Sequence, residues 1–337
     1  MSSDQSSADP DSPIALSVAR QVACALLSLA FAVGVPGNLA VIWTVCRRMK
    51  APPPTVLLIL NLAAADLLAL LTVPFWIYAL AGVWSLGPVV CRTLVWLVNG
   101  SMFSGVLIVT LLSSERLVAL ARPFHLQRWW HLAGARRVLV LLWVAALLLA
   151  APATLTADPS HCLQRQFSSS QQLVTLLLLE TVVGFVGPFT IIAVCSACVR
   201  SHLRKLHHPG RRRASRIVTA VVVVFAVCWL PYHTSNVAAV ASELLEASSS
   251  EPVTWLDYAA DVGHSISAPL AFLGSCINPL LYAFAARRIA RAGGLAGLFA
   301  RMVPSFYCDG ARQVASQSFG ESASGQALGL NSPDSAS

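Results

Sequence analysis

Seven long apolar stretches constrain the fold of this chain more than any other feature. Each one reaches or approaches the ~20 residues that a helix needs to cross ~30 Å of hydrocarbon, and each is longer than the ~10-residue strands of a membrane barrel. Hydrophobic residues make up 56% of the chain and charged residues only 11%, so the polar side chains are too few to cover a soluble globule. The sequence therefore predicts an all-α membrane protein with seven spanning helices, at residues 19–45, 55–79, 92–114, 138–156, 174–199, 216–241 and 258–284.

The distribution of basic residues predicts the orientation of this bundle. If the amino terminus lies outside, Arg20, Arg92 and Arg165 are the outer bases, and the rest of the 23 Lys and Arg lie on the cytoplasmic side. Cytoplasmic loops of membrane proteins carry this excess of Lys and Arg. The net charge of +8 then reflects topology and contact with anionic inner-leaflet lipid. We therefore expect a multi-pass plasma-membrane protein with an extracellular amino terminus and no nucleic-acid partner.

Composition divides the chain into four segments. We expect an extracellular tail at 1–18, the seven-helix bundle at 19–286, a short amphipathic eighth helix at 287–302 and a cytoplasmic tail at 303–337. The tail is rich in Ser, Gly and Ala without an apolar period, which is typical of disorder. Cys308 follows the amphipathic stretch, so it is either a juxtamembrane palmitoylation site or an unmodified thiol.

Serine residues in the cytoplasmic segments are candidate phosphorylation sites. Ser215 follows three arginines, a pattern that basophilic kinases favour, although the same bases also serve topology. Phosphates on the tail would add charge for capture by an arrestin-type partner; the alternative is serine-rich disorder without regulation. The candidate tail sites are Ser316, Ser318, Ser322 and Ser324.

Cysteine placement predicts one disulfide. Cys91 and Cys162 are the two of nine cysteines that fall on the outer, oxidising side, so they are the natural pair. The bond would tie the second outer loop to the start of the third helix. From Cys91 a helix covers about 37 Å to Arg116 at ~1.5 Å per residue, which brings Glu115 and Arg116 to the cytoplasmic face. Ionisable residues at that depth are candidates for function.

Eight motifs occur in order along the seven spans. They are Gly37-Asn38, Asn61 to Asp66, Trp84 before Cys91, Glu115-Arg116-Leu117, Trp143, Pro188, Cys228-Trp229-Leu230-Pro231 and Asn278-Pro279-Leu-Leu-Tyr282. Taken together, they resemble the rhodopsin-like (class A) G protein-coupled receptors. Further stretches, such as VGVPGNLAVIW (33–43), ETVVGFVGPF (180–189) and WLPYHTSNVAAV (229–240), make the chain most similar to the leukotriene B4 receptors of the chemoattractant branch.

The resemblance implies a two-state signalling bundle that activates heterotrimeric G proteins of the inhibitory class and that receptor kinases and arrestin regulate. Arg116 would pair with Glu115 at rest and turn toward the G protein on activation. Leu117 and Ser196 stand where many members have Tyr, which makes this switch a variant. The implied switch residues are Asp66, Glu115, Arg116, Trp229, Pro231, Asn278, Pro279 and Tyr282.

The family also binds a sodium ion beside the helix-two Asp. Here Asp66, Ser275 and Asn278 supply oxygen atoms, but Gly105 stands where the family often has Ser. The alternative to a sodium site is a water-linked hydrogen-bond network without an ion. Beyond this candidate allosteric ion we expect no cofactor.

The outer half of the bundle is apolar with few polar groups, which suits a long apolar ligand with hydroxyls or one acidic head. Leukotriene B4 or a related oxidised fatty acid fits that description. The candidate ligand-binding residues are Trp96, Asn99, Met102, Phe103, Glu180, Tyr232, His233 and His264.

Two positions depart from the leukotriene receptor pattern. Val95 and Ala157 stand where those receptors carry a His and a basic residue, so the carboxylate of a lipid needs another partner. The available ones are Arg92, Arg165, His161 and His264. We expect Glu180, without a basic partner, to be protonated and to donate to a ligand hydroxyl, or else to bond a backbone carbonyl.

Other classes of protein fit less well. A chemotactic peptide receptor is the closest alternative, because the third outer loop is acidic and suits a basic ligand. The only lysines, Lys50 and Lys205, are cytoplasmic, which excludes an opsin, and Val98 replaces the Asp of amine receptors. A membrane transporter lacks support, since no paired inverted repeat is visible. No enzyme is expected, because no nucleophile lies beside a base.

Overall fold

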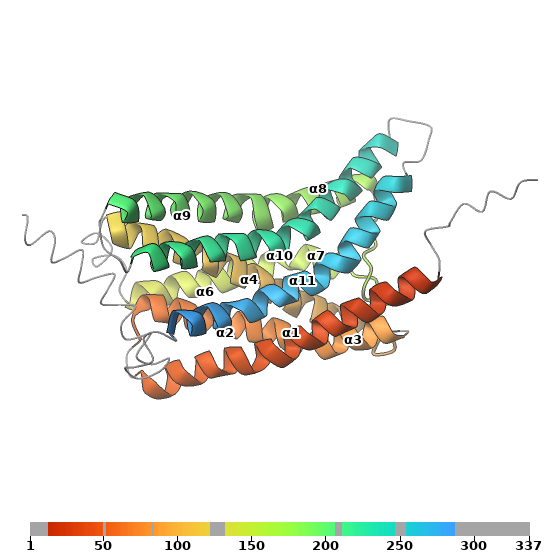
Figure 1. Cartoon of the computed structure of the whole chain (residues 1–337). Coiled ribbons are helices and arrows are strands. Elements are labelled where there is room, and N and C mark those ends of the chain that lie inside the picture. Colours follow the sequence, from red (N-terminus) through yellow and green to blue (C-terminus); the bar gives the residue numbers. More distant parts are fainter. Residues whose placement is uncertain are drawn as a thin grey trace, which may run out of the picture.

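Seven helical rods run side by side in a computed structural model of the chain (Figure 1). The structure describes residues 13–49, 52–82, 84–121, 132–205, 211–246 and 254–286. The prediction of an all-α bundle of seven rods is confirmed for this part of the chain. The rods are α1 (Pro13–Arg48), α2 with α3 (Pro54–Leu71, Val73–Ala81), α4 (Gly87–Ala121), α6 with α7 (Leu132–Leu149, Ala151–Thr156), α8 with η1 and α9 (Ser170–Thr181, Val182–Val186, Gly187–Lys205), α10 (Arg211–Glu246) and α11 (Thr254–Ala286).

Some predictions fall outside the described residues. These are the amphipathic helix at 287–302, the tail with Cys308, and the tail sites Ser316, Ser318, Ser322 and Ser324. The side chains of Ser215 and Tyr282 also lie outside them, although both residues are in described helices.

Six of the rods are long and apolar enough to cross a membrane: Arg20–Arg47, Pro54–Ala81, Gly87–Ala121, Leu132–Thr156, Ser170–His202 and Val222–Glu246. α11 packs along α10 and also against α1 and α2, and so completes the bundle. Large apolar side chains stay exposed on the outside of the rods, for example Leu141 and Leu148 on α6 and Val227 on α10. Lipid accepts such an apolar surface, and the helices satisfy their own backbone hydrogen bonds within it.

Prolines break three of the rods where they pass through the outer half. α3 begins one residue before Pro74, α7 begins one residue before Pro152, and the π-helical segment η1 ends just before Pro188. Proline has no backbone N–H and clashes with the preceding turn, so the ladder of i to i−4 bonds is interrupted there. At the first break the Thr72 hydroxyl donates to Ala69 O, and Trp76 Nε1 donates to Thr72 Oγ1 at 2.8 Å. Side-chain hydrogen bonds thus replace some of the backbone hydrogen bonds that are lost at the break.

The rods are held together by separate apolar clusters in the outer and inner halves. The outer cluster surrounds Cys91 and includes Trp76 and Phe272, whereas the inner cluster centres on Leu58 and Ile108. Polar side chains link rods between these levels. Asn38 of α1 donates to the Ser275 carbonyl of α11 at 3.1 Å, and Trp143 of α6 donates to Asn61 of α2 at 3.2 Å.

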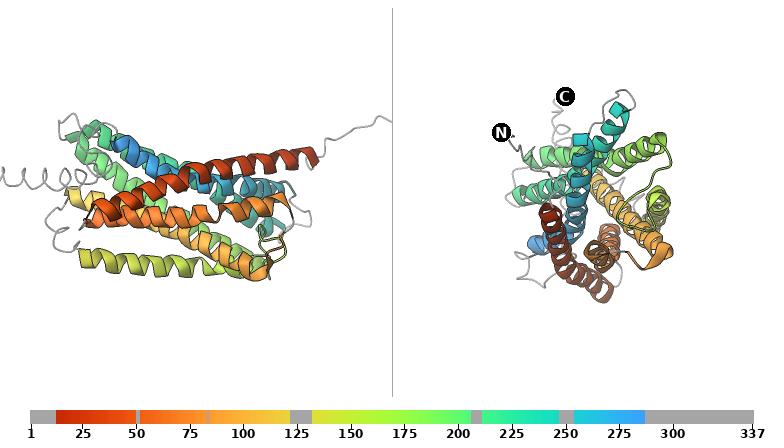
Figure 2. Two further views of the ribbon diagram at one scale, coloured as in Figure 1. Left: turned by 90° about the horizontal axis from the view of Figure 1, so that it is seen from below. Right: turned by 90° about the vertical axis from the view of Figure 1, so that its right-hand side faces the viewer.

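At the outer end of the bundle, the rods are not equally close to one another. The outer ends of α10 and α11 lie together and lean away from α1 (Figures 1 and 2). Gly263 of α11 allows this closeness, because a Cβ at that position would collide with the Ser235 side chain of α10. Small residues at helix contacts commonly permit such an approach in membrane bundles. The candidate ligand residues lie at this outer level.

Candidate functional site: a polar cluster beneath the second outer loop

The second outer loop folds into a short hairpin that the predicted disulfide anchors. Cys91 and Cys162 are bonded, with their Cα atoms 5.6 Å apart, which confirms the pairing expected from their outer placement. Ala157 and Arg165 form an antiparallel bridge. The Gln166 N–H donates to Thr156 O at 2.7 Å, and the Asp158 N–H donates to Gln164 O at 3.0 Å. The hairpin and the disulfide together fix the position of Arg165 over the bundle.

Asp158 holds the turn of this hairpin. Its Oδ1 accepts from the Ser160 hydroxyl at 2.6 Å and from the Ser160 N–H at 2.8 Å, and its Oδ2 accepts from Gln166 Nε2 at 2.8 Å. These hydrogen bonds, the Ser160 hydroxyl first, lower the pKa of Asp158 below its ordinary value because they stabilise the charged form. The carboxylate is therefore charged at neutral pH, and it orders the loop that carries Arg165.

Arg165 points from the loop to a carboxylate within the bundle. Its Nη1 donates to both oxygens of Glu180 on α8, at 2.9 and 3.0 Å, and its Nε donates to Thr156 Oγ1 at 3.0 Å. The Tyr232 hydroxyl of α10 donates to Glu180 Oε2 at 3.2 Å. The expectation that Glu180 has no basic partner is therefore corrected. A loop arginine, brought down by the hairpin, supplies the positive charge that Val95 of α4 and Ala157, the residue after α7, lack.

Two histidines and an asparagine extend this group between α8, α10 and α11. His264 Nε2 lies 2.8 Å from Asn236 Oδ1, and His233 Nδ1 lies 3.4 Å from Thr181 Oγ1. The Tyr232 ring meets both imidazoles edge-on, with centroids 5.2 Å from His233 and 5.5 Å from His264. We call this group the polar cluster, and define it as Arg165, Glu180, Tyr232, His233, Asn236 and His264.

The sequence pattern identifies every member of the polar cluster except Asn236, with Arg165 only as one of several bases. Asn236 has no exposed surface and lies one helical turn after Tyr232, on the same face of α10. The i to i+4 spacing from Tyr232 is the signal that could have identified it.

Three buried nitrogens of the polar cluster have no hydrogen-bond partner among the described residues: Arg165 Nη2, His233 Nε2 and Asn236 Nδ2. Buried polar atoms in native proteins are mostly paired, so each exception calls for an explanation. Guanidinium and amide nitrogens can only donate. The cluster therefore presents unused donors to a ligand that enters it, which favours a ligand with acceptor oxygens.

The four other predicted ligand residues, Phe103, Met102, Asn99 and Trp96, lie outside the polar cluster. Phe103 and His233 converge on η1, because a Cβ at Gly184 would lie 3.2 Å from Phe103 and 3.6 Å from His233. Met102 lines a cavity deeper in the bundle. Asn99 donates to its own helix at Val95 O (2.8 Å), and Trp96, 39% exposed, donates to Leu147 O of α6 at 3.1 Å. Trp96 thus links α4 to α6, apart from the polar cluster.

Comparison with known proteins decides the family. The chain matches the 7 transmembrane receptor (rhodopsin family) pattern over residues 37–282. The chain belongs to the rhodopsin family of seven-transmembrane receptors. The receptor is 37% identical to leukotriene B4 receptor 1 of Homo sapiens over 290 residues, which cover 84% of this chain and 81% of that one. It is 34% identical to leukotriene B4 receptor 2 of Homo sapiens over 275 residues, covering 79% and 76%.

A third relative shows how widely this similarity extends. Somatostatin receptor type 5 of Bos taurus is 31% identical to the receptor over 272 residues, which cover 77% of this chain and 71% of that one. Family membership confirms a multi-pass protein of the plasma membrane that is a receptor and not an enzyme. The resemblance to leukotriene B4 receptors is also confirmed, whereas the ligand itself has to be argued from the site.

An aromatic stack connects the polar cluster of the receptor to the middle of α10. Phe185 stacks on His233 with centroids 5.0 Å apart and on Phe225 at 5.9 Å, and Trp229 lies 6.2 Å from His233. Pro231 lies inside α10, between Trp229 and His233. His233 and the predicted switch Trp229 thus lie in ring contact on either side of a proline, which lacks the N–H for a backbone bond in helix α10.

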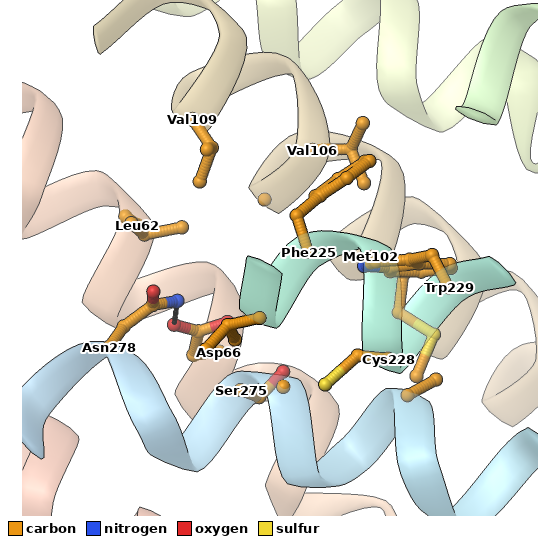
Figure 3. A pocket seen from close by; sticks show the side chains of 14 residues that line it. Leu62, Asp66, Met102, Val106, Val109, Phe225, Cys228, Trp229, Ser275 and Asn278 are labelled. Carbon is orange, nitrogen blue, oxygen red and sulfur yellow. Dashed lines mark hydrogen bonds between the residues drawn. The ribbon is translucent and has the colours of Figure 1, made fainter. Parts of the chain in front are cut away.

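A cavity of about 60 Å³ lies below Trp229, between α2, α4, α10 and α11 (Figure 3). It exceeds the ~10–15 Å³ that one water requires. Asp66, Ser275 and Asn278 border it, and Asn278 Nδ2 donates to Asp66 Oδ2 at 2.8 Å. Gly105 also borders it, while the Ser104 hydroxyl donates instead to Gly100 O. Three oxygen-bearing side chains, one of them a carboxylate, fit a hard cation such as sodium with added water.

Removal of the Asp66 carboxylate tests this sodium site. We expect Asp66→Asn to abolish the effect of sodium on agonist affinity, whereas in the unaltered receptor sodium should lower that affinity by roughly fivefold or more, within the usual range of allosteric coupling. Gly105→Ser should lower the sodium concentration required, because a Cβ there lies 3.9 Å from Asp66 Oδ1. Agonist competition binding in sodium chloride against N-methylglucamine chloride measures both. A sodium effect that persists in Asp66→Asn would favour the water network.

At the cytoplasmic end, Glu115 is buried and contacts a neighbouring helix. Thr55 Oγ1 of α2 donates to Glu115 Oε1 at 2.5 Å. Arg116 is half-buried beside it, and Ser196 of α9 is buried at 7% exposure. Glu115 thus has a described partner on α2, and its pairing with Arg116 stays a prediction.

Proposed function

We propose that the receptor binds leukotriene B4 or a related oxidised fatty acid and signals through heterotrimeric G proteins of the inhibitory class in chemotaxis or inflammation. The unused donors of the polar cluster carry this proposal. They are Arg165 Nη2 and Asn236 Nδ2, with His233 Nε2 as a third nitrogen that lacks a partner among the described residues. A ligand with one carboxylate and a few hydroxyls offers the acceptors that these atoms lack.

The surroundings of the polar cluster support an apolar ligand chain. Phe185 and Trp229 flank His233, and Phe103 of α4 lies, like His233, next to Gly184 of η1. Binding sites for small molecules are largely apolar, with a few placed polar groups that fix the ligand's orientation. The similarity to two leukotriene B4 receptors points to the same ligand chemistry.

A peptide ligand is the second candidate. Glu246 at the end of α10 and Asp257 and Asp261 on α11 are exposed at the outer end of the bundle, where they would attract a basic peptide. The similarity to a somatostatin receptor is only slightly lower than that to the leukotriene receptors. The two ligand classes therefore have to be compared in one experiment.

A screen of the expressed receptor separates these candidates. Cells are exposed to leukotriene B4, to hydroxy fatty acids, and to formylated and basic peptides, while cyclic AMP and calcium are recorded. We expect leukotriene B4 or a hydroxy fatty acid to lower cyclic AMP at submicromolar concentration, and pertussis toxin, which blocks inhibitory G proteins, to remove the response. Cells without the receptor are the control. A response to peptides alone, with none to lipids at micromolar concentration, would overturn the proposal.

We further propose that the cytoplasmic segments regulate signalling. Receptor kinases would phosphorylate Ser316, Ser318, Ser322 and Ser324, and the added charge would recruit arrestin. Palmitoylation of Cys308 would hold residues 287–302 at the inner leaflet, since one acyl chain adds membrane affinity. These sites rest on the sequence pattern.

A further inference from the structure

We propose that Glu180 is an internal competitor for the ligand's carboxylate, which binds Arg165 through its free Nη2 and weakens the Arg165–Glu180 ion pair. The inference rests on the proposed function, because it assumes an acidic lipid as ligand. A loop residue, Arg165, then recognises the acid group of the ligand, and Glu180 weakens the binding of that group instead of contributing a favourable contact.

Arg165 is the outer base best placed for this role. Arg92 and His161 are exposed, and His264 Nε2 already contacts Asn236. Arg165 instead is held from three sides: the hairpin bridge to Ala157, the hydrogen bond from its Nε to Thr156, and the Phe167 ring 5.1 Å from its Cζ. Its guanidinium therefore needs little reorganisation to receive an anion.

The geometry of the ion pair leaves half of the guanidinium unused. Nη1 alone donates to both Glu180 oxygens, whereas Nη2 is buried without a partner among the described residues. A guanidinium and a carboxylate commonly pair through two parallel N–H donors. Glu180 does not use the second donor group, so Nη2 keeps its donors for a ligand oxygen that reaches this buried atom.

The charge balance of the site makes the two carboxylates compete. One guanidinium between two carboxylates leaves a net negative charge in a largely buried site, since Glu180 is only 8% exposed. Like charges that share such a site disfavour each other. The ligand's carboxylate must therefore weaken the hold of Arg165 on Glu180, and Glu180 in turn lowers the affinity for acidic ligands.

Tyr232 connects the Arg165–Glu180 ion pair to α10. The hydroxyl of Tyr232 donates to Glu180 Oε2, and Tyr232 follows Pro231 at the bend of α10. When Arg165 transfers to the ligand, Glu180 keeps Tyr232 as its described hydrogen-bond donor. A neutral ligand does not compete for Arg165 and leaves this arrangement in place, so only an acidic ligand changes the hydrogen bonding of Glu180 and Tyr232.

Substitutions that keep shape and change charge test the inference. Glu180→Gln still accepts from Arg165 and Tyr232 but removes the competing charge, so we expect it to raise the affinity for leukotriene B4 by about tenfold and to leave that for leukotriene B4 methyl ester unchanged. Arg165→Gln should lower the affinity for the acid by at least about tenfold, to that of the ester. In Arg165→Gln, the added Glu180→Gln change should have no further effect.

Radioligand displacement on membranes measures these affinities without requiring G-protein coupling. Arg92→Gln, an exposed base on the same side, is the matched control and should change neither affinity, and antibody labelling of an outer epitope confirms equal surface expression. A loss of acid affinity in Glu180→Gln, or none in Arg165→Gln, overturns the competitor role while the proposed function stands. Failure of the unaltered receptor to bind any lipid instead overturns the proposed function.

Discussion

Replacement of Arg116 by Ala should reduce ligand-stimulated G-protein activation to below about a tenth of that of the unaltered receptor, while ligand binding and surface expression persist. Arg116 lies five residues before the cytoplasmic end of α4 at Ala121 and is only half-buried, so its loss leaves no cavity in the packed inner core. Its neighbour Glu115 already has a hydrogen-bond donor in Thr55. The substitution therefore removes a positive charge from the cytoplasmic surface without unpacking the bundle.

A large effect is expected because the ligand shifts the equilibrium between the resting and active states, and the signal depends on the G protein binding the active state. A ligand changes the equilibrium only by its differential affinity for the two states. If the cytoplasmic contact of the active state is lost, binding at the outer site proceeds without a signal. Arginine suits this contact because its planar guanidinium offers several donors at once.

The measurement is ligand-stimulated nucleotide exchange on an added inhibitory-class G protein in membranes, with ligand binding measured on the same preparation. Arg136→Ala is the matched control, since Arg136 is an exposed base near the start of α6 on the same side. We expect it to retain most of the activity. Arg116→Ala membranes that exchange nucleotide at more than half the rate of the unaltered receptor would refute the assigned role.

Hydropathy predicted the rods because a bilayer imposes a length on every span. The apolar run at 92–114, for example, lies within α4 (Gly87–Ala121). The helix continues past the hydrocarbon at both ends, where polar and charged residues are tolerated, so its full extent does not follow from apolarity alone. The breaks before Pro74, Pro152 and Pro188 follow from a residue that cannot donate. The form of each break, a turn at Thr72 or a π-helical segment at Val182–Val186, does not follow from the proline alone.

The polar cluster shows that a partner contributed by a loop is harder to predict from the sequence than a helix. Glu180, Tyr232, His233 and His264 stand out because polar groups in apolar helices need partners. The sequence did not identify Arg165 as the partner of Glu180. Arg165 lies in a loop, 15 residues before Glu180, and reaches it only because the hairpin and the disulfide turn the loop over the bundle. Periodicity describes helices, and it carries no information on where a loop side chain will lie.

Trp96 shows that residue type alone does not determine which neighbouring rod a side chain contacts. An aromatic residue in the outer half of α4 fits a ligand pocket equally well on any face, yet Trp96 donates to the Leu147 carbonyl. That carbonyl lies just before the break at Ala150, where Pro152 weakens the ladder of α6 and α7. Because the indole N–H bonds to this carbonyl, the Trp96 side chain contacts α6 and is not part of the polar cluster.

Loss of the disulfide should have the second large effect, and it should fall on ligand binding. Cys162→Ala opens a covalent loop of 71 residues, and the chain-entropy model assigns roughly 4 kcal/mol to a loop of that length. The transmembrane rods keep their lipid-facing and packed surfaces, so the loss concentrates in the loop. Arg165 lies three residues after Cys162, and its position over Glu180 depends on that anchor. We expect affinity for the acidic ligand to fall by at least about tenfold.

Variants at both cysteines separate the bond from the side chains. Cys91→Ala and the double variant Cys91→Ala with Cys162→Ala should match Cys162→Ala, because each change removes the same bond and the effects cannot add. Cys24→Ala, a half-buried free cysteine of α1, is the control and should bind normally. Dithiothreitol should lower binding in the unaltered receptor and leave the double variant unchanged. Normal acid affinity in Cys162→Ala would mean that the hairpin positions Arg165 without its covalent anchor, through Asp158 and the backbone bonds alone.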